Sequence, residues 1–238
     1  MAQPVQQSLA IAAGITPSLT DTLQILRPQG HLPSSPVYPP CQAGSFGTHV
    51  TSLTDAFFAF FHHSHPFLLP QARLRKLLER TNLPHLESAI RYIGSSYVPS
   101  APTGLLEKSV DELLFHRNPP KDGFTVQAML LFAIGLHANG ERERSMEVMQ
   151  TAVSIALDIG LHRRDFAPRN AAGCNVTEES WRRTWWELYV VDGMLAGVNR
   201  STPSRLHDVA SDVSLPCEES DFATGVSDTH HPGLIYFC

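Results

Sequence analysis

Cysteine and lysine are scarce in this sequence, and their scarcity limits the functions that it can encode. The four cysteines among the 238 residues are Cys41, Cys174, Cys217 and Cys238. No two of them form a C-x-x-C pair, so their spacing indicates neither a zinc finger nor a dithiol redox motif. The formal net charge is -5, and the lysines are limited to Lys76, Lys108 and Lys121. The chain therefore lacks the clustered basic residues that bind nucleic-acid phosphates.

Signals for secretion and for membrane insertion are also missing. No lysine or arginine precedes Arg27, so the positively charged start of a signal peptide is absent. The longest apolar run, 128–136, falls well short of the roughly 20 residues that a membrane-spanning helix needs. Isolated cysteines suit a reducing compartment. We therefore expect a protein of the nucleus or the cytoplasm, with no membrane partner.

The first 50 residues differ in composition from the remainder. They contain two charged side chains, Asp21 and Arg27, and seven prolines, including Pro39 and Pro40. Prolines at this density prevent a continuous helix or strand, so 1–50 is predicted to be a disordered arm. A short helix is expected within it, at about 18–26.

From residue 51 onward, apolar residues recur at helical spacing between short runs of proline, glycine and capping residues. Asn82, Asn139 and Thr177 are expected to begin helices, whereas Gly94 and Gly160 are expected to end them. No segment shows the alternation of a strand. The predicted fold is all-α, an irregular multi-helix domain over 51–222 followed by a tail over 223–238. The longer helices are predicted at 71–80, 82–93, 105–116, 124–138, 140–159 and 177–197.

The last predicted helix carries the most distinctive pattern. Glu178 precedes Arg182, and Glu179 precedes Arg183, by four residues, in the order that favours ion pairs along a helix. Trp186 lies off the apolar face and needs a second contact surface, which a neighbouring helix would provide. The apolar residues that share the predicted buried face are Trp181, Trp185, Leu188 and Leu195. Periodicity alone indicates a buried helix with ion pairs on its surface.

Several short motifs follow one another in a fixed order along this part of the chain. A helix ends in G-L-H-R, the next contains R-R-T-W-W and reaches an acidic residue, and a turn with proline leads to L-P. The order resembles the fungal-specific transcription factor domain, the middle homology region of zinc-cluster regulators. Upstream, F-F-A-F-F-H-H-S-H-P-F-L over 57–68 is similar to the opening helix of that family. The residues that carry the resemblance within 53–221 are Gly160, Leu161, His162, Arg163, Arg182, Arg183, Trp185, Trp186, Asp192, Pro203, Leu215 and Pro216.

The resemblance implies a regulator of transcription that acts on RNA polymerase II target genes in the nucleus. The family reads DNA through an N-terminal cluster of six cysteines and two zinc ions, which this sequence lacks. Ser201 and Thr202 stand before Pro203 where the family often has Gly-Arg-Pro, and further helices usually follow. We therefore expect an incomplete domain, from a truncated product or gene model. Implied partners are DNA through the missing zinc cluster, a second copy of the chain, and a small-molecule effector or a co-regulator protein.

The arginines of the motifs offer an alternative interpretation as a DNA-reading patch. Acidic residues at helical spacing already neutralise Arg182 and Arg183, and the surrounding composition of the chain is acidic, with a formal net charge of -5. In the family that the chain resembles, the zinc cluster reads DNA. A structural or ligand-sensing role for these arginines is therefore expected.

Two other classes of protein remain consistent with the residues. One is a helical interaction scaffold. The sequence shows no repeat with a period of about 34 residues, which counts against the solenoid form of such a scaffold. The other is a helical metal-dependent enzyme that would use the acidic residues of 208–221 or the histidines His62, His63 and His65. Those acidic residues lack the spacing of a calcium-binding loop, and the common catalytic signatures are absent. We therefore expect no catalysis, and no metal or other cofactor in this chain.

Overall fold

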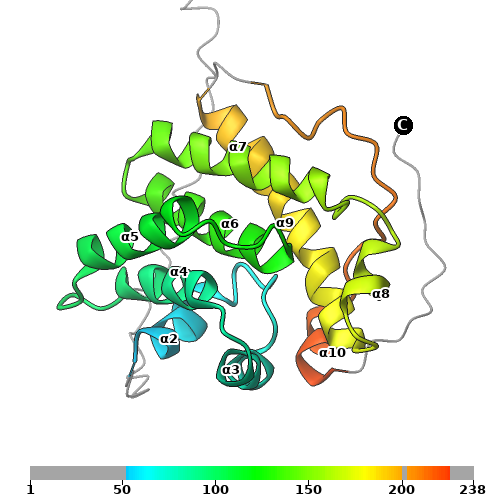
Figure 1. Cartoon of the computed structure of the whole chain (residues 1–238), viewed down its shortest axis with the longest axis horizontal. Helices are drawn as coiled ribbons and strands as arrows, with labels where there is room; N and C mark the ends of the chain where they lie inside the picture. Colours follow the sequence, from blue (N-terminus) through cyan, green and yellow to red (C-terminus); the bar gives the residue numbers. More distant parts are fainter. Residues whose placement is uncertain (1–51, 200–202, 226–238) are drawn as a thin grey trace, which may run out of the picture. The chain divides into compact units, whose positions relative to one another are not determined.

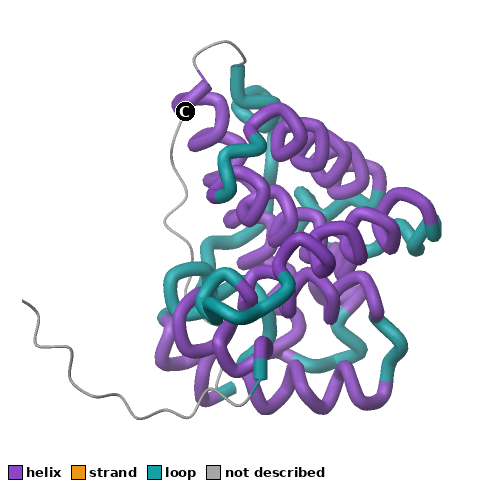
Figure 2. Tube along the Cα trace, turned by 90° about the vertical axis from the view of Figure 1, so that its left-hand side faces the viewer, coloured by secondary structure: helices purple, strands orange, loops and turns teal. Residues whose placement is uncertain are grey.

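Capping residues and turns divide the described part of the chain, residues 52–199 and 203–225, into helices joined by loops (Figure 1). This computed structural model separates Met1–Thr48 and His49–Cys238 as two units, and every described residue belongs to the second. The predicted arm 1–50, its helix near 18–26 and most of the predicted tail 223–238 lie outside the described residues. Where the chain is described it contains no strand (Figure 2), which confirms the all-α prediction.

Short helices form the first part of this unit. α2 (Leu53–Ala56) continues into the π-helical turn η2 (Phe57–Phe61), and Ser52 caps α2 by accepting a hydrogen bond from the amide of Asp55 at 3.1 Å. The elements that follow are α3 (Gln71–Arg80), α4 (Pro84–Ser95), α5 (Thr103–Asp111) and η3 (Glu112–His116). Within the described ranges, no helix is long and apolar enough to cross a membrane.

Two predicted boundaries of α4 are wrong. The residue before its first turn is Leu83 rather than Asn82, because Pro84 already occupies the first helical position. Gly94 lies inside the helix and does not end it. A Cβ atom at Gly94 would lie 1.9 Å from the carbonyl oxygen of Leu53, so this glycine permits the close approach of α2 to α4.

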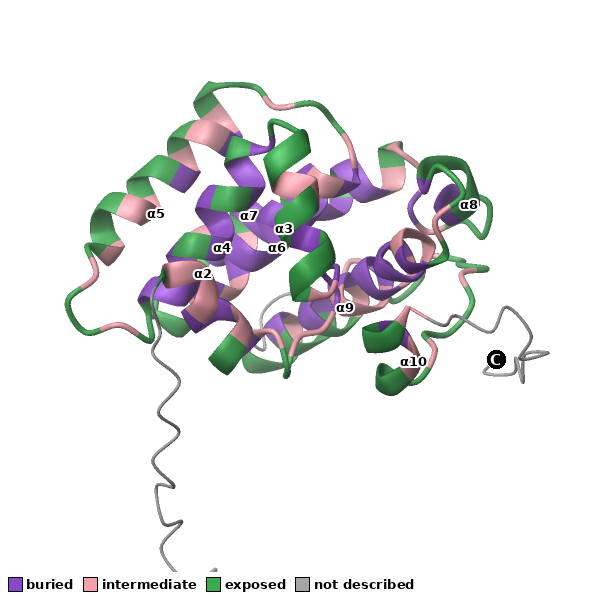
Figure 3. Cartoon of the chain, turned by 90° about the horizontal axis from the view of Figure 1, so that it is seen from below, coloured by how far each residue is buried: buried purple, intermediate pink, exposed green. Residues whose placement is uncertain are grey.

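The centre of the core is α6 (Gly123–Ala138), whose residues are buried on nearly every side. Asp122 caps it by accepting a hydrogen bond from the amide of Thr125 at 2.9 Å. Buried residues gather on α4, α6, α7 (Arg142–Asp158) and α9 (Asn175–Asn199), whereas α3 presents mostly exposed residues (Figure 3). A Cβ atom at Gly123 would lie 2.6 Å from the ring of Trp181, so α9 packs directly on the start of α6. The predicted central buried helix is confirmed.

The capping role assigned to Asn139 is wrong. Asn139 is the C-cap residue that follows α6 rather than the cap of α7, and its side-chain amide donates to the hydroxyl of Tyr92 at 2.9 Å. Gly140 follows with φ of 88°, a left-handed conformation that stops α6 and reverses the chain. The next helix therefore begins later than predicted, at Arg142.

The turn after α7 follows the prediction closely. Gly160 adopts φ of 79°, the amide of Gly160 donates to the carbonyl of Leu157 at 3.1 Å, and the amide of Leu161 donates to that of Ala156 at 2.8 Å. This pair of bonds is the Schellman arrangement, in which the residue after glycine folds back onto the helix. Leu161 is accordingly buried, with 2% of its surface exposed.

The long helix α9 follows the short α8 (Phe166–Asn170) and begins earlier than predicted. Thr177 is not its cap. The amides of Thr177 and Glu178 already donate to the carbonyl of Cys174, at 2.9 and 3.0 Å, so Asn175 starts the helix. Residues 203–218 then run back along α9 without regular structure, and α10 (Glu219–Thr224) lies beside the first half of α9 (Figure 1). We call residues 203–218 the return segment.

Candidate functional site

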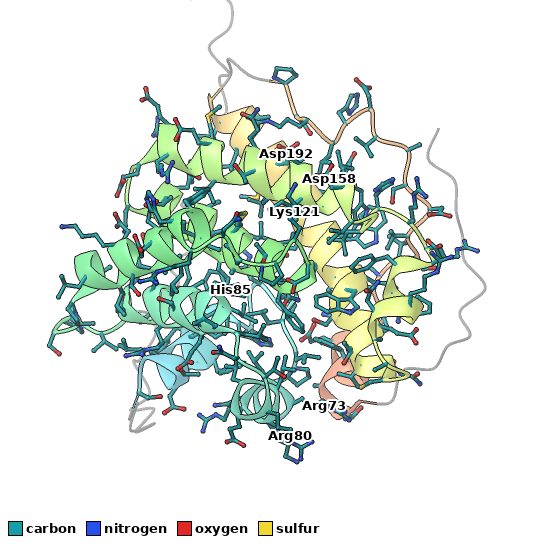
Figure 4. The ribbon with its side chains drawn as sticks, viewed as in Figure 1. Arg73, Arg80, His85, Lys121, Asp158 and Asp192 are labelled. Carbon is teal, nitrogen blue, oxygen red and sulfur yellow. The ribbon has the colours of Figure 1, made fainter. Side chains whose placement is uncertain are left out.

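The family-motif residues of α9 hold the return segment in place. The first attachment is at Asp192, which is buried with 1% of its surface exposed. Its Oδ2 atom accepts hydrogen bonds from the Ser204 hydroxyl at 2.8 Å and from the amides of Arg205 and Leu206 at 2.6 and 3.0 Å. The Arg205 guanidinium lies 3.5 Å from Oδ1. Donors from three successive residues therefore stabilise this buried carboxylate, which lies near the carboxyl end of α9 (Figure 4). Pro203 opens the segment and is exposed.

The second attachment is at Trp186. Its indole nitrogen donates to the carbonyl oxygen of Ser214 at 2.9 Å, and its ring meets that of Tyr189 edge to face, with centroids 5.9 Å apart. The predicted second contact surface is therefore present, and the return segment provides part of it. Leu215 and Pro216, which follow Ser214, remain exposed.

The third attachment is at Glu179, which is 1% exposed. Its Oε1 atom accepts from Arg183 Nε at 2.9 Å and from the amide of Cys217 at 2.8 Å, and its Oε2 atom accepts from Arg182 Nε at 2.8 Å. Both ion pairs that the spacing predicts are present, with Glu178 and Arg182 3.7 Å apart. Glu179 also joins α9 to the return segment, which the spacing did not indicate.

Arg183 connects more segments than any prediction from α9 alone foresaw. It is 7% exposed, and it donates to Glu219 at 2.6 Å, to the carbonyl of Cys217 at 2.8 Å and to the carbonyl of Pro66 at 3.3 Å. Its guanidinium also lies 4.2 Å from the centre of the Phe222 ring. One side chain therefore ties together the loop before α3, α9, the return segment and α10. We call Glu179, Arg183, Glu219 and Phe222 the arginine clamp.

Arg183 stays positively charged although its side chain is buried. Burial on its own would lower the pKa of the guanidinium, but hydrogen bonds to the carboxylates of Glu219 and Glu179 raise that pKa above its ordinary value. Lysine could not replace this side chain, because a single ammonium group lacks the planar fork that reaches several acceptors at once. Glu219, one of the acidic residues considered as metal ligands, starts α10 and pairs with Arg183 in the clamp.

The G-L-H-R turn meets the same return segment further along. The carbonyl of His162 accepts from the Ser211 hydroxyl at 3.0 Å, and the amide of Arg164 donates to the Asp212 carboxylate at 2.7 Å. The His162 ring lies 6.0 Å, between centroids, from that of Trp185, which is fully buried. The structure thus brings most of the motif residues to one feature, the contact between α9 and the return segment.

Two of the three histidines considered as metal ligands, His62 and His65, have other partners. The ring of His62 is 3.2 Å from the carbonyl oxygen of Leu68, and that of His65 is 2.6 Å from Glu187. Burial lowers the pKa of His62, which favours its neutral form. Among the residues with described positions, no three His, Cys, Asp or Glu side chains gather as a metal ion would require.

Comparison with known proteins identifies the family. The family model described as the fungal specific transcription factor domain matches residues 54–233. The chain belongs to this family. That membership confirms the resemblance carried by the ordered motifs, and with it a function in regulating transcription.

Two curated relatives of this fungal transcription factor domain support the assignment. The C6 finger domain transcription factor iacK of Pestalotiopsis fici (strain W106-1 / CGMCC3.15140) is 43% identical over 172 residues, which are 72% of this chain and 26% of that protein. Cutinase transcription factor 1 beta of Fusarium vanettenii is 34% identical over 98 residues, 41% of this chain and 10% of that protein. The chain thus spans 26% or less of the length of these relatives. No solved structure matches the chain.

Proposed function

We propose that this chain is the regulatory part of a nuclear transcription factor, and that it controls activation of RNA polymerase II target genes. In this proposal residues 51–222 form the regulatory domain, and DNA is read by a zinc cluster outside this sequence, as the name of the C6 finger relative implies for that protein. The chain itself binds no zinc or other cofactor and catalyses no reaction. Its partners are a second copy, and a small effector or a co-regulator protein.

The observation that carries the proposal is the arginine clamp. When one partner of a buried ion pair moves away, the other charge is left buried without compensation, which is unfavourable. The contacts of the clamp should therefore form together and be lost together. The return segment has few apolar anchors, of which Leu206 is the most buried. Two discrete states follow, with the return segment and α10 attached to α9 or released from it. A ligand or partner that prefers one state would shift the population between them.

A reporter assay tests this proposal. The whole chain is fused between a heterologous DNA-binding domain and an activation domain, and reporter transcription is compared for the unchanged chain and for Arg183→Met. The substitution keeps the apolar stem but removes one of the two arginines that pair with the buried Glu179, so that Arg182 alone remains. If Arg183→Met releases the return segment, its reporter output should differ severalfold from that of the unchanged chain when the two proteins are present at equal levels.

Two further variants keep this test decisive. Glu219→Gln removes one carboxylate from the α10 side, where Glu219 is 48% exposed, so it weakens the clamp with little risk to the core. Arg80→Met changes an exposed arginine that ends α3 and lies at the edge of the molecule (Figure 4), and it should leave reporter output unchanged. Equal output from the unchanged chain and both clamp variants, with helical content preserved by circular dichroism, would refute the proposal.

A further inference from the structure

A small cavity opens beside the G-L-H-R turn. It has a volume of about 100 Å³ and lies between the end of α7, α8, the first half of α9 and the return segment. Its apolar walls are Leu161, Phe166, Trp181 and Val213, and three arginines stand around it: Arg163, Arg164 and Arg182. Trp181 and Phe166 are 4% and 8% exposed, so these two walls belong to the core, whereas Val213 belongs to the return segment.

The arginines around this cavity are not equally neutralised. Arg182 is held by Glu179 at 2.8 Å and by Glu178 at 3.7 Å. The side chain of Arg164 donates to a neutral group, the carbonyl of Asp212, at 3.4 Å, while the Asp212 carboxylate binds the Arg164 amide instead.

The side chain of Arg163 has no hydrogen bond or ion pair within 52–199 and 203–225, although its backbone amide donates to the carbonyl of Gly160 at 2.9 Å. It is exposed, and its Cδ atom packs near Gly160, 3.6 Å from where a Cβ atom on that glycine would lie. The neighbouring Asp165 is already paired with Arg169 at 2.9 Å. In a chain whose net charge is -5, an unpaired arginine at the mouth of an apolar cavity is a local excess of positive charge.

The chemistry of these walls selects a class of ligand. Guanidinium groups bind carboxylates and phosphates through paired hydrogen bonds. Inorganic phosphate has no apolar part and would leave the tryptophan and phenylalanine walls without contacts. The volume is below the roughly 300 Å³ at which pockets for drug-sized ligands begin. We propose that this cavity, the arginine pocket, binds a small organic carboxylate whose short apolar part lies against Trp181.

Occupation of the arginine pocket would also bear on regulation, and this step rests on the proposed function. Val213 belongs to the return segment, whereas Arg163 and Trp181 belong to the body of the domain. A ligand that touches both binds better when the segment is attached, and it therefore shifts the population toward the attached state.

Direct binding to the purified whole chain tests the proposal. The chain has three tryptophans, all in α9, so a ¹⁵N-labelled sample gives a small set of indole N–H signals, and Trp181→Phe assigns the signal from the pocket. The chain is titrated with isobutyrate, with its neutral isostere isobutyramide, and with inorganic phosphate. We expect a saturable shift of the Trp181 signal with isobutyrate and no saturable shift with the other two compounds.

Matched arginine variants locate the site. Arg163→Gln should weaken isobutyrate binding at least about tenfold, because a hydrogen bond between charged groups is lost. Arg80→Gln changes an exposed arginine on α3 that forms no ion pair with any described residue, and it should leave binding unchanged. No saturable shift, or an equal shift with isobutyramide, overturns the proposal; tighter binding of phosphate overturns the choice of a carboxylate. Because no reporter is involved, failure here leaves the clamp proposal standing, and the reverse also holds.

Discussion

α6 and the return segment are attached to the same domain by different kinds of interaction. In α6 nearly every side chain is buried and apolar, and no ion pair joins it to any residue that the structure describes. The return segment exposes most of its residues, including Leu215 at 67%, and is attached through the carboxylates of Asp192 and Glu179 and the indole of Trp186. Apolar burial is non-directional and tolerates small shifts, whereas hydrogen bonds to buried charges require one geometry. In the proposed two states, the return segment would therefore be attached or released while the core around α6 stays unchanged.

The largest effect is expected in α6. Phe132 is 1% exposed and meets the ring of Tyr92 edge to face, with centroids 5.5 Å apart. Phe132→Ala should lower the free energy of unfolding by about 3–5 kcal/mol, because it removes apolar contacts and leaves a cavity. Chemical denaturation measures this loss. Leu105→Ala is the control, since Leu105 is 69% exposed, and it should change stability by less than about 0.5 kcal/mol.

An intermediate effect is expected at the first attachment of the return segment. Asp192→Asn keeps the size of the side chain but replaces a charged acceptor, so the attachment should weaken by about 1–2 kcal/mol. Hydrogen exchange at the amides of Arg205 and Leu206 should accelerate, while α6 is unaffected.

The matched control for that change is Asp158→Asn. Asp158 pairs with Lys121 at 3.3 Å on the surface, where the two side chains are 55% and 67% exposed (Figure 4). Such pairs contribute little, so exchange in the return segment should not respond. Acceleration throughout the domain in Asp192→Asn would mean that the segment is part of the core, and it would remove the distinction between the two regions.

The smallest effect is expected from pH, and it concerns the core. Burial lowers the pKa of the His85 imidazole below its ordinary value of 6.5, although Asp122 acts in the opposite direction. The folded protein therefore binds the proton less readily than the unfolded chain, and stability falls as pH drops below 6.5 toward the folded-state pKa. One proton contributes at most about 1.4 kcal/mol per pH unit.

His85→Gln should remove this part of the acid dependence. Denaturation curves between pH 7 and pH 5 measure it, with the unchanged protein as reference. An acid slope that is identical in the variant would show that His85 does not contribute, and other carboxyl or imidazole groups would then account for the loss.

Local signals in the sequence predicted one region much better than the other. α6 and the turn at Gly160 follow from an all-round apolar segment and a left-handed glycine, which act within a few residues. Asn139 was predicted to cap the wrong helix because an asparagine suits both the end of one helix and the start of the next. The left-handed Gly140 that follows it determines that α6 ends there. The pairing of Glu179 with Arg183 follows from helical spacing alone.

The rest of the site depends on residues far apart in the sequence. Glu219 and the carbonyl of Pro66 reach Arg183 from other segments, and nothing in α9 indicates them. α10 is too short for apolar periodicity, and Phe222 is its one buried side chain. An acidic tract and a tryptophan-rich helix in the sequence therefore could not reveal the clamp, which depends on contacts between segments that are far apart along the chain.

Native-state hydrogen exchange tests the central claim most directly. The amides of Leu206 and Cys217 donate to Asp192 and Glu179, at 3.0 and 2.8 Å, so their exchange reports release of the return segment. We predict that both open with a free energy at least about 2 kcal/mol below that of the amide of Leu130 in α6, through one shared local opening. Equal opening free energies in the two regions, with equal dependence on denaturant, would contradict the account.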